Sequence, residues 1–255
     1  MTPLSSVKKS LQVLQAFSAE QPERSVTEIS RFLNAHKSSV SRILATLATE
    51  GFVEKNPANN RYRLGLKLLD LANLVLGRYE LRELAGPYME VLARVTGEIV
   101  HLSILDKSDI VYLEKKGGGQ TLTVATKVGG RNPAHASAMG KVLLSGLSPE
   151  EFGQILPVAS LTRLTPRTIS EKGELIKELE RVRDHGFAVD DEESFPGIRC
   201  VAAPIRAEDG RTVAAISVTV PKQRMGRQRV EEIRERVIET GRLISARMGA
   251  CRLEG

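Results

Sequence analysis

The stretch Lys37-Ser-Ser-Val-Ser-Arg-Ile-Leu-Ala-Thr-Leu-Ala-Thr-Glu50, which Gly51 follows, predicts a helix with two unlike faces. The opposite sides of this helix differ in polarity, because one arc carries small polar side chains and one long hydrogen-bond donor, Arg42. The other arc is apolar and suits a core: Val40, Ile43, Leu44 and Leu47. A helix with small exposed side chains can enter the major groove of DNA and bring its donors to the base edges.

The segments on both sides of this helix predict a winged helix-turn-helix. Residues 7–17 have apolar side chains at helical spacing, and Ser25-Val-Thr-Glu28 has the capping-box pattern of a helix start. Residues 52–64 contain two strand-like segments around an Asn/Pro turn, which predicts a hairpin with Arg61 and Arg63 on one face. Three helices followed by a hairpin are the order of elements in such a domain.

This segment also carries an excess of positive charge. The first 65 residues contain nine Lys and Arg against five Asp and Glu, so they hold +4 of the net charge of +6. A local basic excess favours a polyanionic partner, and double-stranded operator DNA suits a helix of this kind. The alternative is a three-helix module that docks another protein. The candidate DNA contacts are Lys37, Ser38, Ser39, Ser41, Arg42 and Thr46 on the helix, and Arg61 and Arg63 on the hairpin.

Composition argues against several classes of protein. The 255 residues contain no apolar run of about 18 residues, so no membrane span is expected. The N-terminal residues lack the pattern of a secretory signal. The two cysteines, Cys200 and Cys251, lie far apart and form no CxxC pair, which argues against a disulfide framework and a structural zinc site. We therefore expect a cytoplasmic protein with no metal and no cofactor.

A helix without a polar face is expected after the hairpin. Leu64–Leu76 is apolar almost all round, and such a helix must be covered on more than one side. We interpret it as a linker that a second subunit partly buries; the alternative is a central core helix of one domain. The predicted organisation is a winged helix-turn-helix at 1–65, a linker and dimerisation helix at 66–78, and an effector-binding regulatory domain at 79–255.

The remaining residues alternate irregularly between strand and helix patterns, which predicts an α+β domain. A helix expected at Tyr79–Thr96 contains Gly86-Pro87, which should kink or divide it. The other expected helices are residues 137–147, a segment after Ser148-Pro149, 171–185 and 227–248. The expected strands are residues 99–105, 110–115, 122–127, 187–189, 200–206 and 213–220.

Two features of this domain suggest a binding site for a small acid. The turn Gly129-Gly130 precedes a helix that opens with small side chains, so N–H groups near Ala138 and Met139 suit a carboxylate. Close packing of helix on sheet is the alternative reason for those small residues. Ser217 and Thr219 alternate with apolar residues along a strand, so they share a polar face that either meets solvent or lines a pocket.

The acidic run Asp190–Glu193 allows two interpretations. Asp190, nearest the preceding strand, is placed to accept hydrogen bonds from ligand hydroxyls; otherwise the run is a solvated surface. A hypothesis of a different class is a small-molecule enzyme or metal-dependent sensor that uses His135, Asp190 and Cys200, for instance as a thiol triad.

Five motifs occur in an order that strongly resembles the IclR family of bacterial transcription regulators. They are Lys37-Ser-Ser-Val-Ser-Arg42, Arg61-Tyr-Arg-Leu-Gly65, His135-Ala-Ser-Ala-Met-Gly-Lys141, Asp190-Asp-Glu-Glu…Gly197-Ile-Arg-Cys-Val-Ala-Ala-Pro204 and Ala214-Ala-Ile-Ser-Val-Thr219. The resemblance covers almost the whole chain. It implies a winged helix, a linker helix that pairs subunits, a C-terminal effector domain similar to GAF and PAS sensors, and a homodimer or a tetramer built from dimers.

The resemblance also implies an effector pocket for a small organic acid or an aromatic compound. Asn132 stands where some members have an apolar residue, which suggests a more polar ligand. Residues 128–133, with 99–102 upstream, are similar to the branch that regulates pectin and sugar-acid breakdown, whose usual effector is a 2-keto-3-deoxy sugar acid. We therefore predict a ligand-responsive DNA-binding regulator, a repressor, that binds a small organic or sugar acid. The other pocket residues that carry over are Ala138, Met139, Asp190, Ile198, Cys200, Ser217 and Thr219.

Overall fold

The apolar arc of the quoted stretch packs into a small helical core, as the sequence predicts. Val40 and Leu44 are buried together with Val13, Ile29 and Tyr62. The computed structural model describes residues 4–77, 79–117, 126–158 and 161–253. The chain divides into two compact units, Met1–Arg78 and Tyr79–Gly255.

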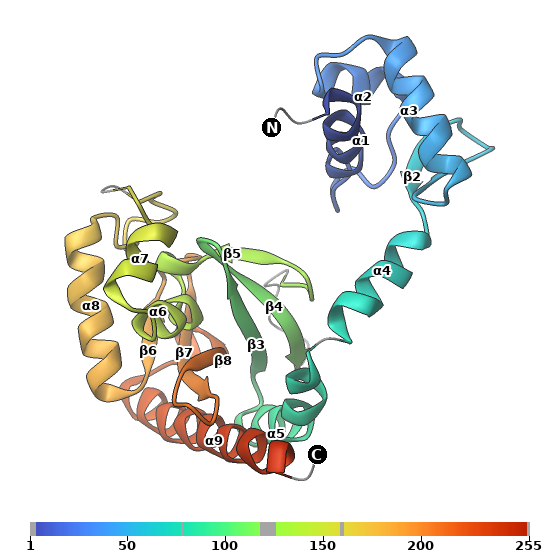
Figure 1. The fold of residues 1–255 in the computed structure, drawn as a ribbon. Coiled ribbons are helices and arrows are strands. Elements are labelled where there is room, and N and C mark those ends of the chain that lie inside the picture. Colours follow the sequence, from blue (N-terminus) through green and yellow to red (C-terminus); the bar gives the residue numbers. More distant parts are fainter. Residues whose placement is uncertain (1–3, 78, 118–125, 159–160, 254–255) are drawn as a thin grey trace. The chain divides into compact units, whose positions relative to one another are not determined.

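The first unit is a winged helix-turn-helix followed by one further helix (Figure 1). Strands β1 and β2 pair antiparallel and form the predicted hairpin. The backbone at Gly65 passes so close to Gly51 that a Cβ atom at position 65 would overlap the Gly51 carbonyl. The elements are α1 (Ser5–Gln15), α2 (Val26–Phe32), α3 (Lys37–Thr49), β1 (Val53–Lys55), β2 (Tyr62–Leu64) and α4 (Lys67–Leu76).

The helix expected at Leu64–Leu76 begins later than predicted. Leu64 is the last residue of β2, so α4 begins at Lys67. The alternative of a central core helix is wrong, because α4 buries none of its residues within this structure. Its leucines remain largely exposed.

The second unit is a six-stranded antiparallel sheet with helices on both faces, in the order β5-β4-β3-β8-β7-β6 (Figure 1). The strands are β3 (Ile99–Asp106), β4 (Asp109–Lys116), β5 (Arg131–Pro133), β6 (Ala188–Asp191), β7 (Ile198–Arg206) and β8 (Thr212–Pro221). The helices are α5 (Glu80–Thr96), α6 (Ala138–Ser145), α7 (Pro149–Ile155), α8 (Lys172–His185) and α9 (Arg227–Leu253), with short 3-10 turns η1 (Ala134–Ala136) and η2 (Lys222–Arg224).

Each face of this sheet has its own apolar core. Val100, Leu102 and Val218 point to the face that α5 and α9 cover. The residues that alternate with these along the strands point to the other face; Ala202 and Ala215, for example, face α6 and α8. Because neighbouring residues of a strand point to opposite faces, His101 and Ser217 lie on the α6 side.

Most predicted elements of the α+β domain are confirmed. The exceptions are the break expected in α5, the strand expected at 122–127 and one strand that was not expected. Gly86-Pro87 does not divide α5, which runs from Glu80 to Thr96 and is held on the sheet by buried Met89 and Leu92. The strand expected at 122–127 lies mostly outside the described residues, and the part that is described forms no strand. The short strand β5 was not predicted. No helix in the described ranges is both long and apolar enough to cross a membrane.

Candidate DNA-binding face and ligand pocket

The polar arc of α3 is open to solvent. Lys37, Ser38, Ser41, Arg42 and Thr46 are exposed, and Ser39 is half-buried. Their surface therefore presents two long cationic side chains and small polar groups on one helix, without an apolar or aromatic side chain among them. This arrangement lets the backbone of a helix approach a groove of DNA closely.

The two hairpin arginines predicted to contact DNA both form ion pairs within the unit. Arg61 Nη2 lies 2.7 Å from Glu28 Oε1, and Arg63 Nη2 lies 2.9 Å from Glu54 Oε2. Glu28 also completes the predicted capping box of α2 with Ser25. The backbone N–H and the hydroxyl of Ser25, together with Arg61, lower the pKa of Glu28 to about 2. Arg61 thus ties the wing to the start of α2.

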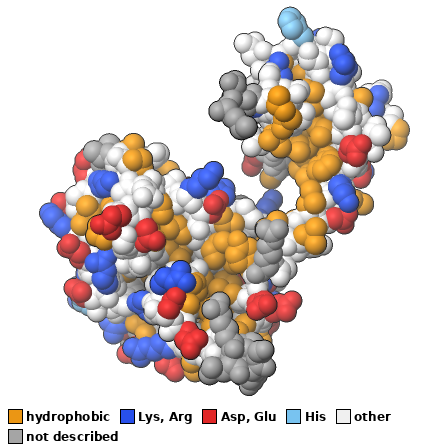
Figure 2. Space-filling model, in the orientation of Figure 1, with side chains coloured by type: hydrophobic (Ala, Val, Ile, Leu, Met, Phe, Trp, Pro, Cys, Tyr) orange, Lys and Arg blue, Asp and Glu red, His pale blue; other side chains and the backbone are white. Residues whose placement is uncertain are grey.

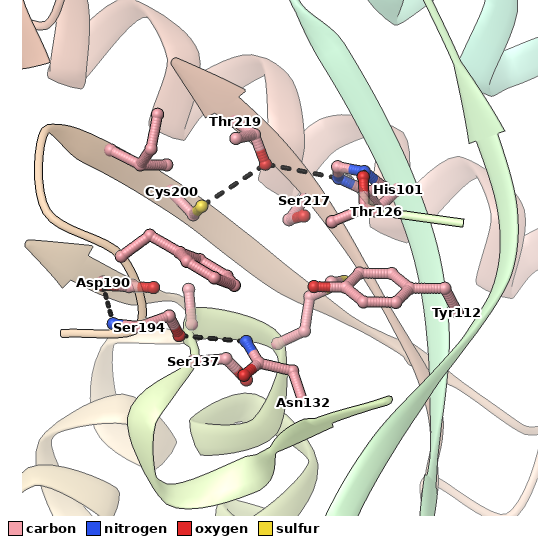
Figure 3. A pocket seen from close by; sticks show the side chains of 14 residues that line it. His101, Tyr112, Thr126, Asn132, Ser137, Asp190, Ser194, Cys200, Ser217 and Thr219 are labelled. Atoms are coloured by element: carbon pink, nitrogen blue, oxygen red, sulfur yellow. Dashed lines mark hydrogen bonds between the residues drawn. The ribbon is translucent and has the colours of Figure 1, made fainter. Parts of the chain in front are cut away.

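A pocket of the second unit lies between the α6 face of the sheet and the start of α6 (Figure 3). All eight effector residues that the sequence singles out line this one pocket: Asn132, Ala138, Met139, Asp190, Ile198, Cys200, Ser217 and Thr219. Six further side chains complete its walls: His101, Tyr112, Thr126, Ser137, Ser194 and Phe195. None of these lining residues is Lys or Arg.

The sheet supplies a polar floor to the pocket. In the strand register, His101 of β3 is opposite Ser217 of β8, and Cys200 of β7 is opposite Thr219. Thr219 Oγ1 lies 3.2 Å from His101 Nδ1 and 3.3 Å from Cys200 Sγ (Figure 3). The Oγ atom of Ser217 is fully buried and finds no hydrogen-bond partner in the described part of the chain.

Burial keeps the ionisable groups of this floor neutral. Desolvation, helped by nearby Lys115, lowers the pKa of His101 to about 3, so its imidazole carries no charge at neutral pH. Desolvation likewise raises the pKa of the Tyr112 phenol and of the Cys200 thiol far above neutrality. The floor therefore offers dipoles, and no formal charge, to a ligand.

The start of α6 forms the facing wall. The Ser137 hydroxyl caps this helix by accepting a hydrogen bond from the N–H of Gly140 at 3.0 Å. Asn132 donates to the Ser194 hydroxyl at 3.0 Å, and that hydroxyl donates to the carbonyl of Ala136 at 2.6 Å. These bonds tie three separate segments around the first turn of α6.

Asp190 is a buried wall residue and does not belong to a solvated acidic surface. It is 2% exposed, and its Oδ1 accepts hydrogen bonds from the N–H groups of Glu193 and Ser194 at 2.6 and 3.3 Å. Burial raises the pKa of Asp190 to about 7, although the N–H bond from Glu193 opposes this shift. The interpretation of the run as solvated is therefore wrong for Asp190 and for buried Glu193.

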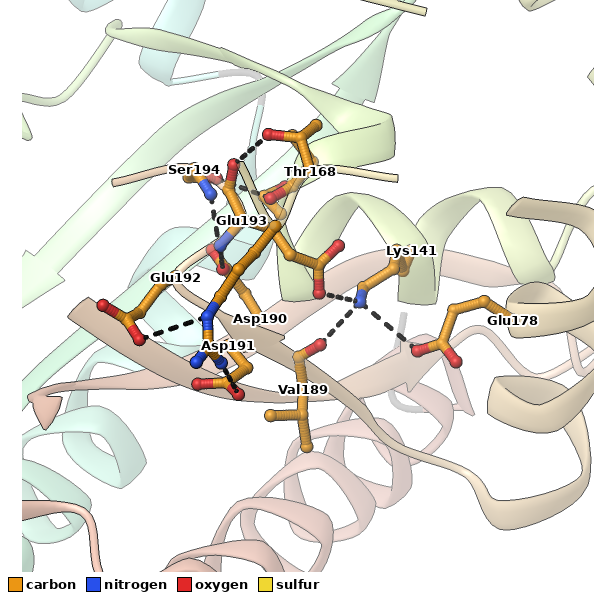
Figure 4. Close-up of polar contacts among 12 residues, drawn as sticks. Lys141, Thr168, Glu178, Val189, Asp190, Asp191, Glu192, Glu193 and Ser194 are labelled. Carbon is orange, nitrogen blue, oxygen red and sulfur yellow. Dashed lines mark hydrogen bonds and ion pairs between the residues drawn. The ribbon is translucent and has the colours of Figure 1, made fainter. Parts of the chain in front are cut away.

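Behind Asp190, a buried lysine joins the helices to the sheet (Figure 4). The Nζ atom of Lys141 lies 2.6 Å from Glu193 Oε1, 3.3 Å from Glu178 Oε1 and 2.6 Å from the Val189 carbonyl. Lys141 belongs to α6, Glu178 to α8 and Val189 to β6. This ammonium group is consequently engaged away from the pocket.

The pocket is narrow. Its cavity is about 20 Å³, which is room for about one water molecule. Phe195, from the loop after β6, lines it and is 45% exposed. A ligand with several heavy atoms can enter only if a wall moves.

Two family models match the chain over most of its length. The IclR helix-turn-helix domain matches residues 6–57, and the C-terminal domain of the bacterial transcriptional regulator IclR matches residues 73–246. The chain belongs to the IclR family.

Relatives in this family are transcriptional regulators. The regulator XynR of Escherichia coli is 34% identical over 249 residues, which cover 98% of this chain and 99% of XynR. The regulator KdgR of the same organism is 36% identical over 246 residues, which cover 96% and 93%. The solved structure of an IclR homolog from Microbacterium hydrocarbonoxydans in complex with 4-hydroxybenzoate is 26% identical with a TM-score of 0.81, and covers 95% of this chain and 99% of that one. This chain is thus a DNA-binding transcriptional regulator of the IclR family.

The hypothesis of a catalytic or metal-binding set made of His135, Asp190 and Cys200 is wrong. His135 lies outside the residues that line the pocket, and its Nε2 is 2.9 Å from the carbonyl of Thr162. The raised pKa of Cys200 keeps its thiol protonated, whereas a nucleophile must be a thiolate. Within the described residues, no group of three His, Cys, Asp or Glu side chains could hold a metal ion.

Several residues in and behind the pocket were not predicted from the sequence. His101 is a polar residue between the apolar residues Val100 and Leu102 of β3, and this position was available as a signal. Ser194 and Phe195 follow the acidic run in a loop, where no periodicity points to a pocket. Lys141 is an ordinary lysine in sequence, although it is 1% exposed in the structure.

Removing the titration of Asp190 should make stability less dependent on pH. An unfolded aspartate has a pKa near 3.8, so between about pH 4 and pH 7 the unfolded chain loses a proton that folded Asp190 keeps. The contribution of Asp190 to wild-type stability therefore falls across this window, and the deficit persists above it. Asp190→Asn retains an acceptor at Oδ1 and should be more stable at pH 8 by on the order of 2–4 kcal/mol, with the gain shrinking toward pH 4.

Urea unfolding from pH 4 to pH 8 measures this difference. Asp191→Asn is the matched control, because Asp191 is the next residue but forms ion pairs with Arg199 and Arg167 outside the pocket. The idea fails if wild type and Asp190→Asn lose stability with pH in parallel.

Proposed function

We propose that this regulator is a repressor that binds symmetric operator DNA through α3 as a dimer, and that a small carboxylic acid in the pocket alters this binding. The observation that carries the ligand proposal is the Ser217 hydroxyl, which is fully buried beside the cavity without a partner in the described chain. Burying an unsatisfied hydroxyl costs about 1–3 kcal/mol, and a ligand oxygen would remove that cost. A regulator of this kind acts on chromosomal DNA, so we infer a cytoplasmic location.

The pocket favours a polar acid as the effector. N–H groups near Ala138 and Met139 at the start of α6 suit a carboxylate. Asp190 and Asn132 supply polar groups for hydroxyls. We propose a hydroxylated acid, of which the 2-keto-3-deoxy sugar acids are the example that residues 128–133 suggest. An aromatic acid is the competing ligand, because Met139, Ile198, Tyr112 and Phe195 add apolar walls.

The exposed leucines of α4 support a second subunit. Leu66, Leu69 and Leu74 are 70%, 60% and 69% exposed, and all three lie at or within a ten-residue helix. Figure 2 shows apolar side chains gathered on the first unit. Contiguous apolar surface of this kind marks an interaction site, and two α4 helices related by a two-fold axis would cover each other. Whether two such dimers assemble into a tetramer is a further part of this proposal.

The first prediction concerns the DNA contacts of α3. Arg42→Ala should weaken binding to DNA from upstream of the gene by about 1–3 kcal/mol if Arg42 contacts a base. Lys37→Ala should weaken binding to every duplex and lower the salt dependence by about one phosphate contact. Fluorescence anisotropy on the upstream fragment and an unrelated duplex, from 50 to 300 mM salt, measures both effects.

Arg42→Lys is the matched control for this contact. It keeps the charge and loses the bidentate geometry, so it should lose sequence preference while retaining binding to the unrelated duplex. Unchanged affinity of Arg42→Ala and Lys37→Ala for both duplexes would remove α3 from the interface.

The second prediction concerns assembly. The wild type should be at least a dimer by light scattering at micromolar concentration. Leu71→Glu would bury a carboxylate in the subunit interface and should raise the dimer dissociation constant at least about 100-fold. Asn73→Glu, on the same helix, is the control for helix propensity and charge. A monomeric wild type would contradict the proposal.

The third prediction separates ligand binding from stability. Ser217→Ala removes a buried hydroxyl that has no hydrogen-bond partner in the described part of the chain. The free energy of unfolding of the ligand-free variant should therefore be about 1 kcal/mol higher than that of wild type. The same variant should bind its acid at least about fivefold more weakly. Gluconate and 4-hydroxybenzoate serve as hydroxylated and aromatic probes in calorimetry.

Ser145→Ala is the control in this experiment. Ser145 is also buried, but its hydroxyl is satisfied by the Val142 carbonyl. Its removal should gain no stability and leave affinity unchanged. Equal probe affinity in wild type and Ser217→Ala would show that this hydroxyl does not meet the ligand.

A further inference from the structure

We propose that the pocket binds its acid as one negative charge together with one proton, that Asp190 carries this proton, and that the pocket thereby excludes acids with two negative charges. The inference rests on the proposed function, in which a carboxylic acid occupies this pocket. Beyond that function, the inference states how many negative charges the bound acid carries and names Asp190 as the residue that selects for this charge.

The position of Asp190 leaves it without a counter-charge. It stands on β6 opposite Cys200 of β7, and only 2% of its surface is exposed. Its Oδ1 accepts hydrogen bonds from the backbone N–H groups of Glu193 and Ser194, and a hydrogen bond with the Ser194 side chain also lowers its pKa, so each of these partners is a neutral dipole. Two N–H dipoles stabilise an ionised carboxylate only partly when solvent is excluded.

The groups that face Asp190 do not supply a cation either. Cys200 from β7, Tyr112 from β4 and His101 from β3 line the same pocket and are neutral at pH 7. Glu193, three residues along the chain, brings a carboxylate of the same sign, and it is buried.

The cation whose charge lowers the pKa of Asp190, Lys141 of α6, is already engaged. It lies 2.6 Å from Glu193 and 3.3 Å from Glu178 of α8 (Figure 4). The neighbouring acids Asp191 and Glu192 pair outside the pocket with Arg167, Arg199 and Lys222. Asp190 is therefore the one carboxyl group among the lining residues, and no lining residue balances it.

A carboxylate ligand brings a second negative charge into this narrow cavity. Two carboxylates in one buried site repel strongly, and the lower free energy belongs to the state in which one of them holds a proton. When the ligand enters as an anion, an ionised Asp190 takes one proton from the buffer and becomes a neutral carboxyl. The net charge of the site changes by zero, and the carboxyl O–H can donate to a ligand oxygen. The pKa of Asp190, about 7 before any ligand enters, makes this uptake accessible near neutrality.

The balance of charge in the pocket also limits how many negative charges the ligand can carry. An acid with a second carboxylate or a phosphate would need another proton or a cation at the far end of the cavity. The lining residues offer neither a Lys nor an Arg side chain for that purpose. The pocket should therefore prefer an acid with one carboxylate over a matched acid that carries two.

Isothermal titration calorimetry in two buffers tests the proton directly. With gluconate and 4-hydroxybenzoate as probes at pH 8, heats measured in phosphate and in Tris should differ by the uptake of nearly one proton per bound acid. The dissociation constant should rise about tenfold per pH unit above the pKa of Asp190. Glucarate, which matches gluconate but carries a second carboxylate, should bind at least about 100-fold more weakly at pH 8.

Two variants complete the experiment. Asp190→Asn should bind without buffer-dependent heat and with an affinity that does not change between pH 6 and pH 9. Asp191→Asn, whose carboxylate lies outside the pocket, should behave as wild type. The two-buffer measurement on wild type needs no variant, so it stands even if Asp190→Asn folds poorly.

The outcomes separate this inference from the function on which it rests. An acid that binds wild type with a constant affinity from pH 6 to pH 9 and no buffer-dependent heat overturns the proton uptake and leaves the acid pocket standing. Glucarate binding as tightly as gluconate overturns the charge selection. If neither probe binds at millimolar concentration, the acid ligand itself is contradicted, and this inference falls with it.

Discussion

The ammonium group of Lys141 constrains the whole regulatory unit, because a buried cation must be neutralised inside the protein. Its three partners come from the loop after β6, from α8 and from the β6 backbone. Pulling these segments apart would separate the ammonium group from the carboxylates of Glu193 and Glu178 that neutralise it, so the segments are held together. Helix α6 and strand β6, which carries Asp190, are among the segments held in this way. The ammonium group of Lys141 does not line the cavity, yet it helps to fix the positions of α6 and β6 on its two sides.

The two units use charge in opposite ways. In the first unit, Lys37 and Arg42 stand in solvent, where they are available to phosphates and bases. Around the pocket of the second unit, by contrast, no free cation is present among the described lining residues: Lys141 behind the wall is paired, and His101 is neutral. A surface that binds a polyanion needs accessible cations, whereas a cavity that binds a small acid with dipoles benefits from their absence.

Local patterns in the sequence predicted the elements well, because they depend on neighbours along the chain. The capping box at Ser25 and the two faces of residues 37–49 are of this kind, and both occur in the structure. Prediction failed where distant residues decide. Pro87 does not divide α5, since packing on the sheet outweighs one lost hydrogen bond. The ion pair of Arg61 with Glu28, which lies 33 residues away in sequence, was not predicted either, and the DNA contact of Arg61 stays a prediction.

The pocket residues also divide into those that the sequence could predict and those that depend on distant contacts. The eight effector residues came largely from family resemblance, and the structure places all of them around one cavity. The contribution of His101 depends on its register opposite Ser217, which the sequence does not state. The burial of Asp190 depends on how the loop after β6 folds back over it, so a run of four acids looked like solvated surface.

The narrowness of the cavity has a kinetic consequence. A space for about one water molecule admits no larger ligand until part of its wall moves. Association that waits for such a movement is slower than diffusional encounter. At high ligand concentration, the rate at which the regulator responds would then stop rising and equal the opening rate of the wall. At such concentrations, the time lag between the appearance of the ligand and the change at the promoter would be set by the protein and would not shorten when more ligand is added.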